Sequence, residues 1–288
     1  DAQAAGELGY TNTTGNSNTA IGHSALYLND TTNENVAVGF YALYANVASG
    51  NTAIGYKALT ANLSGGTNIA IGHEAMLNNT TGSGNSAVGR SALKLNTTGT
   101  QNVGMGQDVS LFNTTGSNNT ALGYYALFAN ASASNNVAIG HRALSTTTSI
   151  GNQVAIGFES LKLSTSGFKN VAVGYQSAST NTTGGENAVL GDQALNYNVA
   201  GNYNVAIGSK ALQSNTASDN TAVGRFALTA NTSGSSNVAV GKDALLANTT
   251  SHYNTAVGTF SLDGNTTGTK NTASGTYALC KNTTGIQN

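Results

Sequence analysis

A repeated five-residue segment constrains this chain more than any other feature. Asn-(Thr/Val)-Ala-(Ile/Val)-Gly, or a close variant of it, recurs sixteen times between residues 18–22 and 271–275. Of the fifteen intervals between the motif glycines, thirteen are 17 residues and two are 16. Both short intervals lack one residue at the same place in the repeat, between the Asn that precedes the turn and the Asn that opens the next repeat. These are Asn46 to Asn51 and Asn215 to Asn220. Length variation confined to one segment indicates a loop between ordered strands, since a disordered chain has no reason to keep a period.

Each repeat reads approximately N-T-A-I-G-x-x-A-L-x-x-N-T-T-G-x-x. The alternating first segment predicts a strand, and the Ala-Leu pair (Ala25 and Leu26 in the first clear repeat) predicts a second short strand. The Asn, Thr and Gly residues that follow suit a turn. Seventeen residues are too few for a strand-helix unit, so we expect an all-β, parallel β-solenoid with one coil per repeat and strands ~4.8 Å apart. One domain is expected over residues 1–288, with about 17 tandem repeats and a degenerate first repeat at 1–17.

Composition and charge exclude several classes of function. Only 8% of the residues are charged, the net charge is −1, and the eleven basic residues are scattered, which argues against a nucleic-acid partner. No apolar run approaches the ~18 residues of a membrane span, so no membrane insertion is expected. The single cysteine, Cys280, and the widely separated His23, His73 and His141 favour neither a metal site nor a catalytic cluster. We therefore expect a non-enzymatic protein without a cofactor.

The residue that opens each repeat is Asn in fifteen of the sixteen repeats, and Gln153 is the exception. In a solenoid this column forms a ladder, and stacked amides satisfy one another by hydrogen bonds along it. We predict such a ladder at a corner of the coil. In the first half of the chain its members are Asn18, Asn35, Asn51, Asn68, Asn85, Asn102, Asn119 and Asn136.

The first strand indicates self-association. Its central residue is Ala in fourteen repeats, with Gly104 and Val189 as departures, and its flanking residues are mostly Val, Ile, Leu or Thr. Alternation places the Ala side chains on one face and the branched side chains on the other, and both types favour burial. One face is expected to pack inside the coil. The other is an apolar stripe, which we expect to pair with further copies of the chain, most simply as a homotrimer with the stripe at its axis.

These repeats resemble those of a known family. The segment at residues 18–22 and its successors are similar to the Val-Ala-Ile-Gly repeats in the head domains of trimeric autotransporter adhesins. The longer form, with Ala-Leu and Asn-Thr-Thr-Gly at a 17-residue period, resembles repeats of phage and bacterial tail-fibre proteins. The resemblance implies a left-handed parallel β-roll, assembled as a homotrimer and located outside the cell, on a cell surface or a virion. The adhesin repeat is shorter, and no stalk or anchor is recognised in this sequence.

Aromatic residues collect just after the motif glycine and are candidates for binding a cell-surface glycan or receptor, since aromatic rings stack on such ligands. An equal alternative is that they cover the edge of the roll or fill a groove between subunits. The candidates are Tyr41, Tyr56, Tyr124, Tyr125 and Tyr175.

Asn-X-Thr sequences at the turn, such as Asn96-Thr97-Thr98, have two interpretations. They can be glycosylation acceptors, or they can be turn residues multiplied by duplication. Turn chemistry is the preferred interpretation, because the turn itself demands these residue types.

Three functions are consistent with these patterns. The leading one is a structural and adhesive segment of a tail fibre or surface adhesin. The second is a self-assembling extracellular filament, with end-to-end stacking of chains as one route, because residues 272–275 and 283–285 still read as ordinary repeat where a solenoid normally has a cap. The third is an ice-binding solenoid built on the turn threonines, although Val47, Leu63 and Val199 interrupt that column.

Overall fold

The computed structural model describes residues 3–5 and 12–288, so most of the degenerate first repeat lies outside the described residues. The chain divides into two compact units, Asp1–Ser149 (unit 1) and Ile150–Asn288 (unit 2). Every strand is three residues long, and one strand begins each coil. Helices are absent from the described residues, so none of those residues belongs to a helix able to cross a membrane.

Unit 1 contains nine of the strands. They are β1 (Gln3–Ala5), β2 (Thr19–Ile21), β3 (Val36–Val38), β4 (Thr52–Ile54), β5 (Ile69–Ile71), β6 (Ser86–Val88), β7 (Val103–Met105), β8 (Thr120–Leu122) and β9 (Val137–Ile139). Unit 2 contains the other eight. They are β10 (Val154–Ile156), β11 (Val171–Val173), β12 (Ala188–Leu190), β13 (Val205–Ile207), β14 (Thr221–Val223), β15 (Val238–Val240), β16 (Thr255–Val257) and β17 (Thr272–Ser274).

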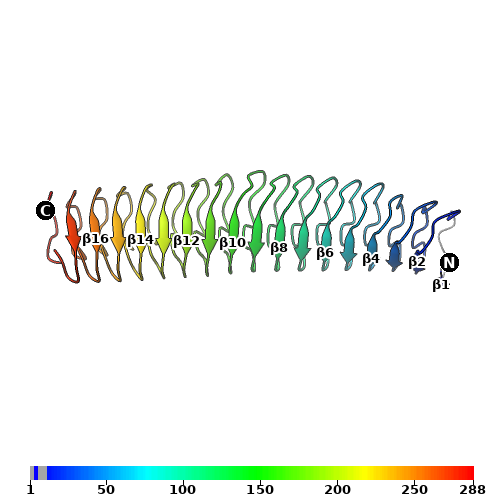
Figure 1. Ribbon diagram of the computed structural model, residues 1–288, viewed down its shortest axis with the longest axis horizontal. Coiled ribbons are helices and arrows are strands. Elements are labelled where there is room, and N and C mark those ends of the chain that lie inside the picture. The colour runs from blue at the N-terminus through cyan, green and yellow to red at the C-terminus, as the bar shows by residue number, and fades with distance from the viewer. Residues whose placement is uncertain (1–2, 6–11) are drawn as a thin grey trace. The chain divides into compact units, whose positions relative to one another are not determined.

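Within each unit, successive strands pair in parallel and in register. Ala53 lies opposite Ala70, and Ala222 lies opposite Ala239, one repeat further along the chain. Figure 1 shows the arrows of each unit side by side in chain order, each joined to the next by one loop of the coil. The predicted all-β parallel β-solenoid of 17-residue coils is thus confirmed. The register is kept across the two 16-residue repeats as well, since Ala37 pairs with Ala53 and Ala206 pairs with Ala222. The missing residue is therefore absorbed in the turn, whereas a slip by one residue within a strand would move its side chains to the opposite faces.

The interior of each coil is narrow and is filled by small and medium apolar side chains. The central Ala of the strand points inward and is fully buried in nearly every coil, as at Ala37, Ala70 and Ala138. The Ala-Leu pair packs against it from the other side of the coil, and Leu43 and Leu127 are fully buried as well. Near-uniform Ala in the strand is therefore a consequence of the short distance across the coil, because interiors close-pack.

The expected second strand is wrong. The residues around the Ala-Leu pair form a turn in which the residue before Ala and the Leu itself have left-handed backbone conformations, for example Tyr41 with φ 56° and Leu43 with φ 50°. This segment still bonds to its neighbour along the stack, since the N–H of Leu43 donates to the carbonyl of Ala58 at 3.0 Å. Alternate left-handed residues curl the segment tightly, and this curl closes the coil within 17 residues.

The motif glycine ends each strand with a backbone that other residues rarely adopt. Gly106 has φ 137°, and a Cβ atom built on it would lie 2.7 Å from the carbonyl oxygen of Gly123 in the next coil. Only glycine allows both this conformation and this approach of two backbones. The glycine column therefore sets the close stacking of the coils at the corner that follows the strands.

Candidate interaction surfaces

The opening Asn column lies at a corner of the coil, and all eight of its predicted members in unit 1 are buried. Asn85 is typical. Its backbone N–H and its side-chain Nδ2 both donate to Oδ1 of Asn68 in the preceding coil, at 2.9 and 3.2 Å. Nδ2 also donates to the carbonyl of Gly99, near the end of the same coil, at 2.9 Å. Oδ1 of Asn85 in turn accepts from the backbone N–H and Nδ2 of Asn102 in the following coil, at 2.9 and 3.1 Å. Each of these amides thus links three coils and satisfies polar backbone groups that water does not reach.

A second Asn ladder runs along the turn. In unit 1 its members are Asn29, Asn46, Asn62, Asn79, Asn96, Asn113 and Asn130, all buried. Nδ2 of Asn96 donates to Oδ1 of Asn79 at 2.8 Å and to the carbonyl of Gly99 at 3.0 Å. Sequence reasoning assigned these residues to turn chemistry and overlooked the ladder, although the recurrence of Asn at a fixed offset was a sufficient signal. In the folded coil these amides are bonded and buried, so they are not presented to a glycosylating enzyme.

The turn threonines that follow this ladder also bond along the stack. Oγ1 of Thr97 donates to the carbonyl of Thr114 at 2.9 Å, and Oγ1 of Thr114 donates to the carbonyl of Ala131 at 2.8 Å. The hydroxyl hydrogens are thus used within the protein, and the second Thr of each pair, such as Thr98, is the exposed one. Val47 and Leu63, both more than half exposed, interrupt this column in unit 1.

Aromatic rings after the motif glycine form a stack along the corner of unit 1. His23, Phe40, Tyr56 and His73 come from four successive coils, with centroids 5.3, 5.5 and 4.8 Å apart and interplanar angles of 18°, 8° and 22°. Tyr41, from the same coil as Phe40, meets it edge-on at 4.4 Å. Both faces of Phe40 and Tyr56 are consequently covered by other rings, and they present their edges to solvent. The stack is therefore a structural element at the roll edge more than a platform for a sugar ring.

The other candidate aromatics also have ring partners. Tyr124 lies 4.0 Å from Tyr125 and 5.4 Å from His141, between ring centroids, and Tyr125 meets Phe128 edge-on at 4.5 Å. The hydrogen bond between Tyr124 and Tyr125 raises the pKa of the Tyr124 phenol. In unit 2, Tyr175 stacks on Phe158 at 5.2 Å. The structure thus assigns the five predicted tyrosines to three separate clusters.

The outward face of the strands is an apolar stripe in each unit. Ile54 is 38% exposed and Leu122 is 44% exposed, whereas the central Ala of each strand is buried. The third residue of each strand forms the more apolar of the two columns on this outward face, and it is called the third column below. In unit 1 its members are Ile21, Val38, Ile54, Ile71, Val88, Met105, Leu122 and Ile139. In unit 2 they are Ile156, Val173, Leu190, Ile207, Val223, Val240, Val257 and Ser274.

Charged side chains gather at the corner after the strands. In unit 1, Nζ of Lys94 lies 2.7 Å from a carboxylate oxygen of Glu74 in the preceding coil, and this hydrogen bond lowers the pKa of Glu74. In unit 2, Lys210, Arg225 and Lys242 come from three successive coils. Arg225 and Lys242 lie over the rings of Phe226 and Phe260.

Among the described residues, no three His, Cys, Asp or Glu side chains lie close enough together to hold a metal ion. The aromatic stack explains two of the four histidines, His23 and His73. Comparison with protein-family models, with curated proteins and with solved structures found no match. The function is therefore inferred from the surfaces of this chain.

Proposed function

We propose that the protein is a structural and adhesive segment of an extracellular fibre or surface adhesin, displayed on a cell or a virion, and that it acts as a homotrimer without catalysing a reaction. The single observation that carries this proposal is the exposed apolar stripe on the outward face of the strands. The solenoid beneath it supplies a repetitive scaffold whose length is set by the number of coils.

The stripe is at least as large as the largest apolar patch of a typical monomer. None of the eight third-column side chains of unit 1 is buried. At roughly 50 Å² each, their exposed surface reaches the ~300–600 Å² of the largest patch on a typical monomer. Short strands with little side-chain freedom, such as Val36–Val38, lose little conformational entropy when they are covered. Closed cyclic symmetry allows three such stripes to meet at an axis and leaves none exposed.

Replacing apolar residues of the stripe by acids tests the trimer. We expect the Ile54→Asp/Leu122→Asp variant to be monomeric by multi-angle light scattering, because an unpaired charge buried at an interface costs several kcal/mol. The unmodified protein should have three times the mass of the chain.

The matched control is Val47→Asp/Leu63→Asp, which makes the same type of change at two exposed apolar residues of the turn. This variant should remain trimeric. A monomeric unmodified protein contradicts the trimer, and open-ended polymers favour the filament subunit over the adhesive segment.

A further inference from the structure

Three cationic side chains follow three consecutive strands of unit 2. Lys210, Arg225 and Lys242 come after β13, β14 and β15, at the corner that each motif glycine turns. Arg225 and Lys242 are exposed and occupy the same column one coil apart, a separation of ~4.8 Å between backbones. In a chain with a net charge of −1, this patch is a local concentration of positive charge.

The positive charge of the patch is only partly compensated. Lys242 lies 3.4 Å from a carboxylate oxygen of Asp243, whose side chain is nearly buried. Within residues 12–288 no carboxylate comes within ion-pair distance of Lys210 or Arg225. The nearest acid in the Arg225 column is Asp192, two coils away, which accepts a hydrogen bond from Ser209. Like charges on neighbouring strands destabilise a sheet, and an external anion between them removes that cost.

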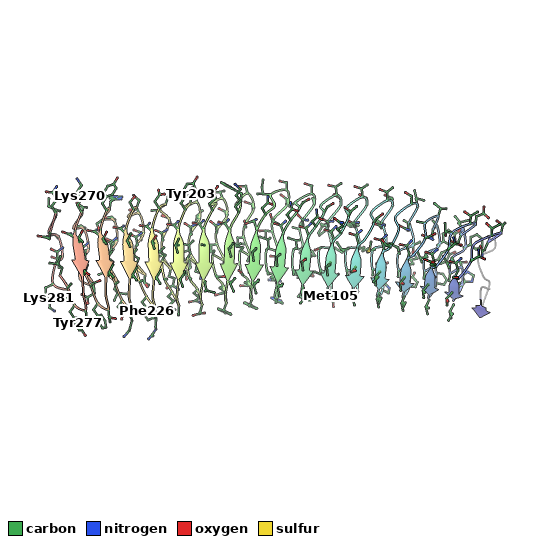
Figure 2. The ribbon with its side chains drawn as sticks, in the orientation of Figure 1. Met105, Tyr203, Phe226, Lys270, Tyr277 and Lys281 are labelled. Carbon is green, nitrogen blue, oxygen red and sulfur yellow. The ribbon has the colours of Figure 1, made fainter. Side chains whose placement is uncertain are left out.

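Aromatic rings support these cations. Phe226 is close to two of them, with the Arg225 guanidinium carbon 4.5 Å and the Lys210 ammonium nitrogen 5.7 Å from its ring centroid. The Lys242 ammonium lies 5.0 Å from the Phe260 centroid, and Tyr277 stacks on Phe260 at 5.0 Å. Such contacts restrict the long side chains and lower the entropy lost when they bind an anion. Figure 2 shows Phe226 and Tyr277 projecting from the edge of unit 2 opposite to Tyr203 and Lys270.

From this arrangement we propose that the Lys210–Arg225–Lys242 patch binds an acidic oligosaccharide, through carboxylate or sulfate groups that bridge cations of neighbouring coils. The inference names the ligand class for the proposed adhesive role and rests on that role for its biological use. A polymer with one charged group per sugar suits cations repeated at the coil spacing. The row of three cations is too short for the many phosphate contacts that give a protein affinity for nucleic acid.

Calorimetric titration of the full chain at low salt tests the site, with a heparin hexasaccharide as the sulfated probe and hexagalacturonate as the carboxylated probe. We expect at least one probe to bind, and the stronger one identifies the anionic group. The Arg225→Gln/Lys242→Gln variant should bind about tenfold more weakly, since each exposed charge contact is worth roughly a factor of three. Lys210→Gln alone should weaken binding about threefold by the same reasoning.

The matched control is Lys169→Gln/Lys270→Gln, which removes the same charge from the opposite edge of unit 2 and should leave affinity within twofold of the unmodified protein. Equal weakening by the control, or equal binding of uncharged cellohexaose, overturns the proposal. A short DNA duplex that binds more tightly than both saccharides overturns the choice of ligand. A trimer that binds neither acidic probe contradicts this inference alone, whereas a monomer that binds one contradicts only the trimer.

Discussion

Gly104 and Val109 occupy two columns that are Ala in most other coils, and they lie in the same coil. A Cβ atom added to Gly104 would lie 3.2 Å from Cγ1 of Val109 and 3.4 Å from Cγ of Leu93 in the preceding coil. The small residue thus makes room for the larger one. By the same register, Val189 is expected to pack beside Ala178, which stands where most coils have Leu.

This exchange of volume predicts coupled mutations. Gly104→Ala and Val109→Ala should each lower the free energy of unfolding. The first crowds the core, and the second leaves a cavity that costs about 1–2 kcal/mol. The double variant restores the pair found in the other coils and should be at least as stable as the unmodified protein. Denaturant unfolding of the four proteins measures the coupling energy, expected to exceed about 1 kcal/mol. Additive effects would contradict direct packing between these two residues.

A single Asn of the opening ladder is expected to matter because it serves two neighbours. Asn119 donates to Asn102 in the preceding coil and to the carbonyl of Ala133, and its Oδ1 accepts from the backbone N–H and Nδ2 of Asn136. Asn119→Leu leaves these buried groups unsatisfied and should reduce the free energy of unfolding by about 2–4 kcal/mol.

The control for this variant is Thr115→Leu, at an exposed turn position only a few residues away. A surface change of this kind should alter stability by no more than about 0.5 kcal/mol. If the two variants unfold at the same denaturant concentration, the ladder hydrogen bonds contribute little to stability.

At the scale of the element, the turn with alternate left-handed residues determines which apolar side chains fit it. Leu127 is fully buried with φ 52°, and Met76 occupies the equivalent position with φ 49°. Left-handed backbone is a strained conformation for a β-branched residue in particular, because its second Cγ crowds the backbone. The column therefore selects residues with an unbranched Cβ, which are Leu or Met in most coils.

Two substitutions of Leu127 that keep the side-chain volume distinguish the effect of side-chain shape on stability from the effect of side-chain size. Leu127→Met should cost less than about 1.5 kcal/mol, as a volume-conserving change. Leu127→Ile should cost about 1–3 kcal/mol more, because it adds backbone strain at a left-handed residue. Thermal unfolding of both variants provides the comparison. A smaller loss for Ile than for Met would show that the segment relaxes to a strand.

At the scale of the whole molecule, a trimer couples stability to concentration. Association stabilises the folded chain by mass action, so the melting temperature should rise with protein concentration, by about 1–2 °C for each tenfold increase in a chain of this size. The Ile54→Asp/Leu122→Asp variant should lose this dependence. A melting temperature that is independent of concentration in both proteins would contradict the trimer.

Much of the fold follows from the period alone. A 17-residue repeat with strand-like alternation and a turn leaves a stacked coil as the economical solution, and the positions of the first strand, the parallel register and the opening Asn ladder follow from it. Periodicity is informative here because equivalent residues of all coils occupy the same environment. The residue types found at one position of the repeat therefore show what that environment requires.

Tertiary structure decided what the pattern could not. The sequence around the Ala-Leu pair predicts a strand. It forms a left-handed turn because the coil must close around an interior so narrow that the strand contributes only an Ala side chain to it. The sequence left open whether the aromatic residues bind a ligand or cover the edge of the roll, and only the structure shows that in-register stacking lets the rings of Phe40 and Tyr56 cover each other's faces. Sequence determined which residues share a column, because the repeat length sets the register. The direction of each side chain, and hence which surfaces remain free to bind, was decided by how tightly the coils close and stack.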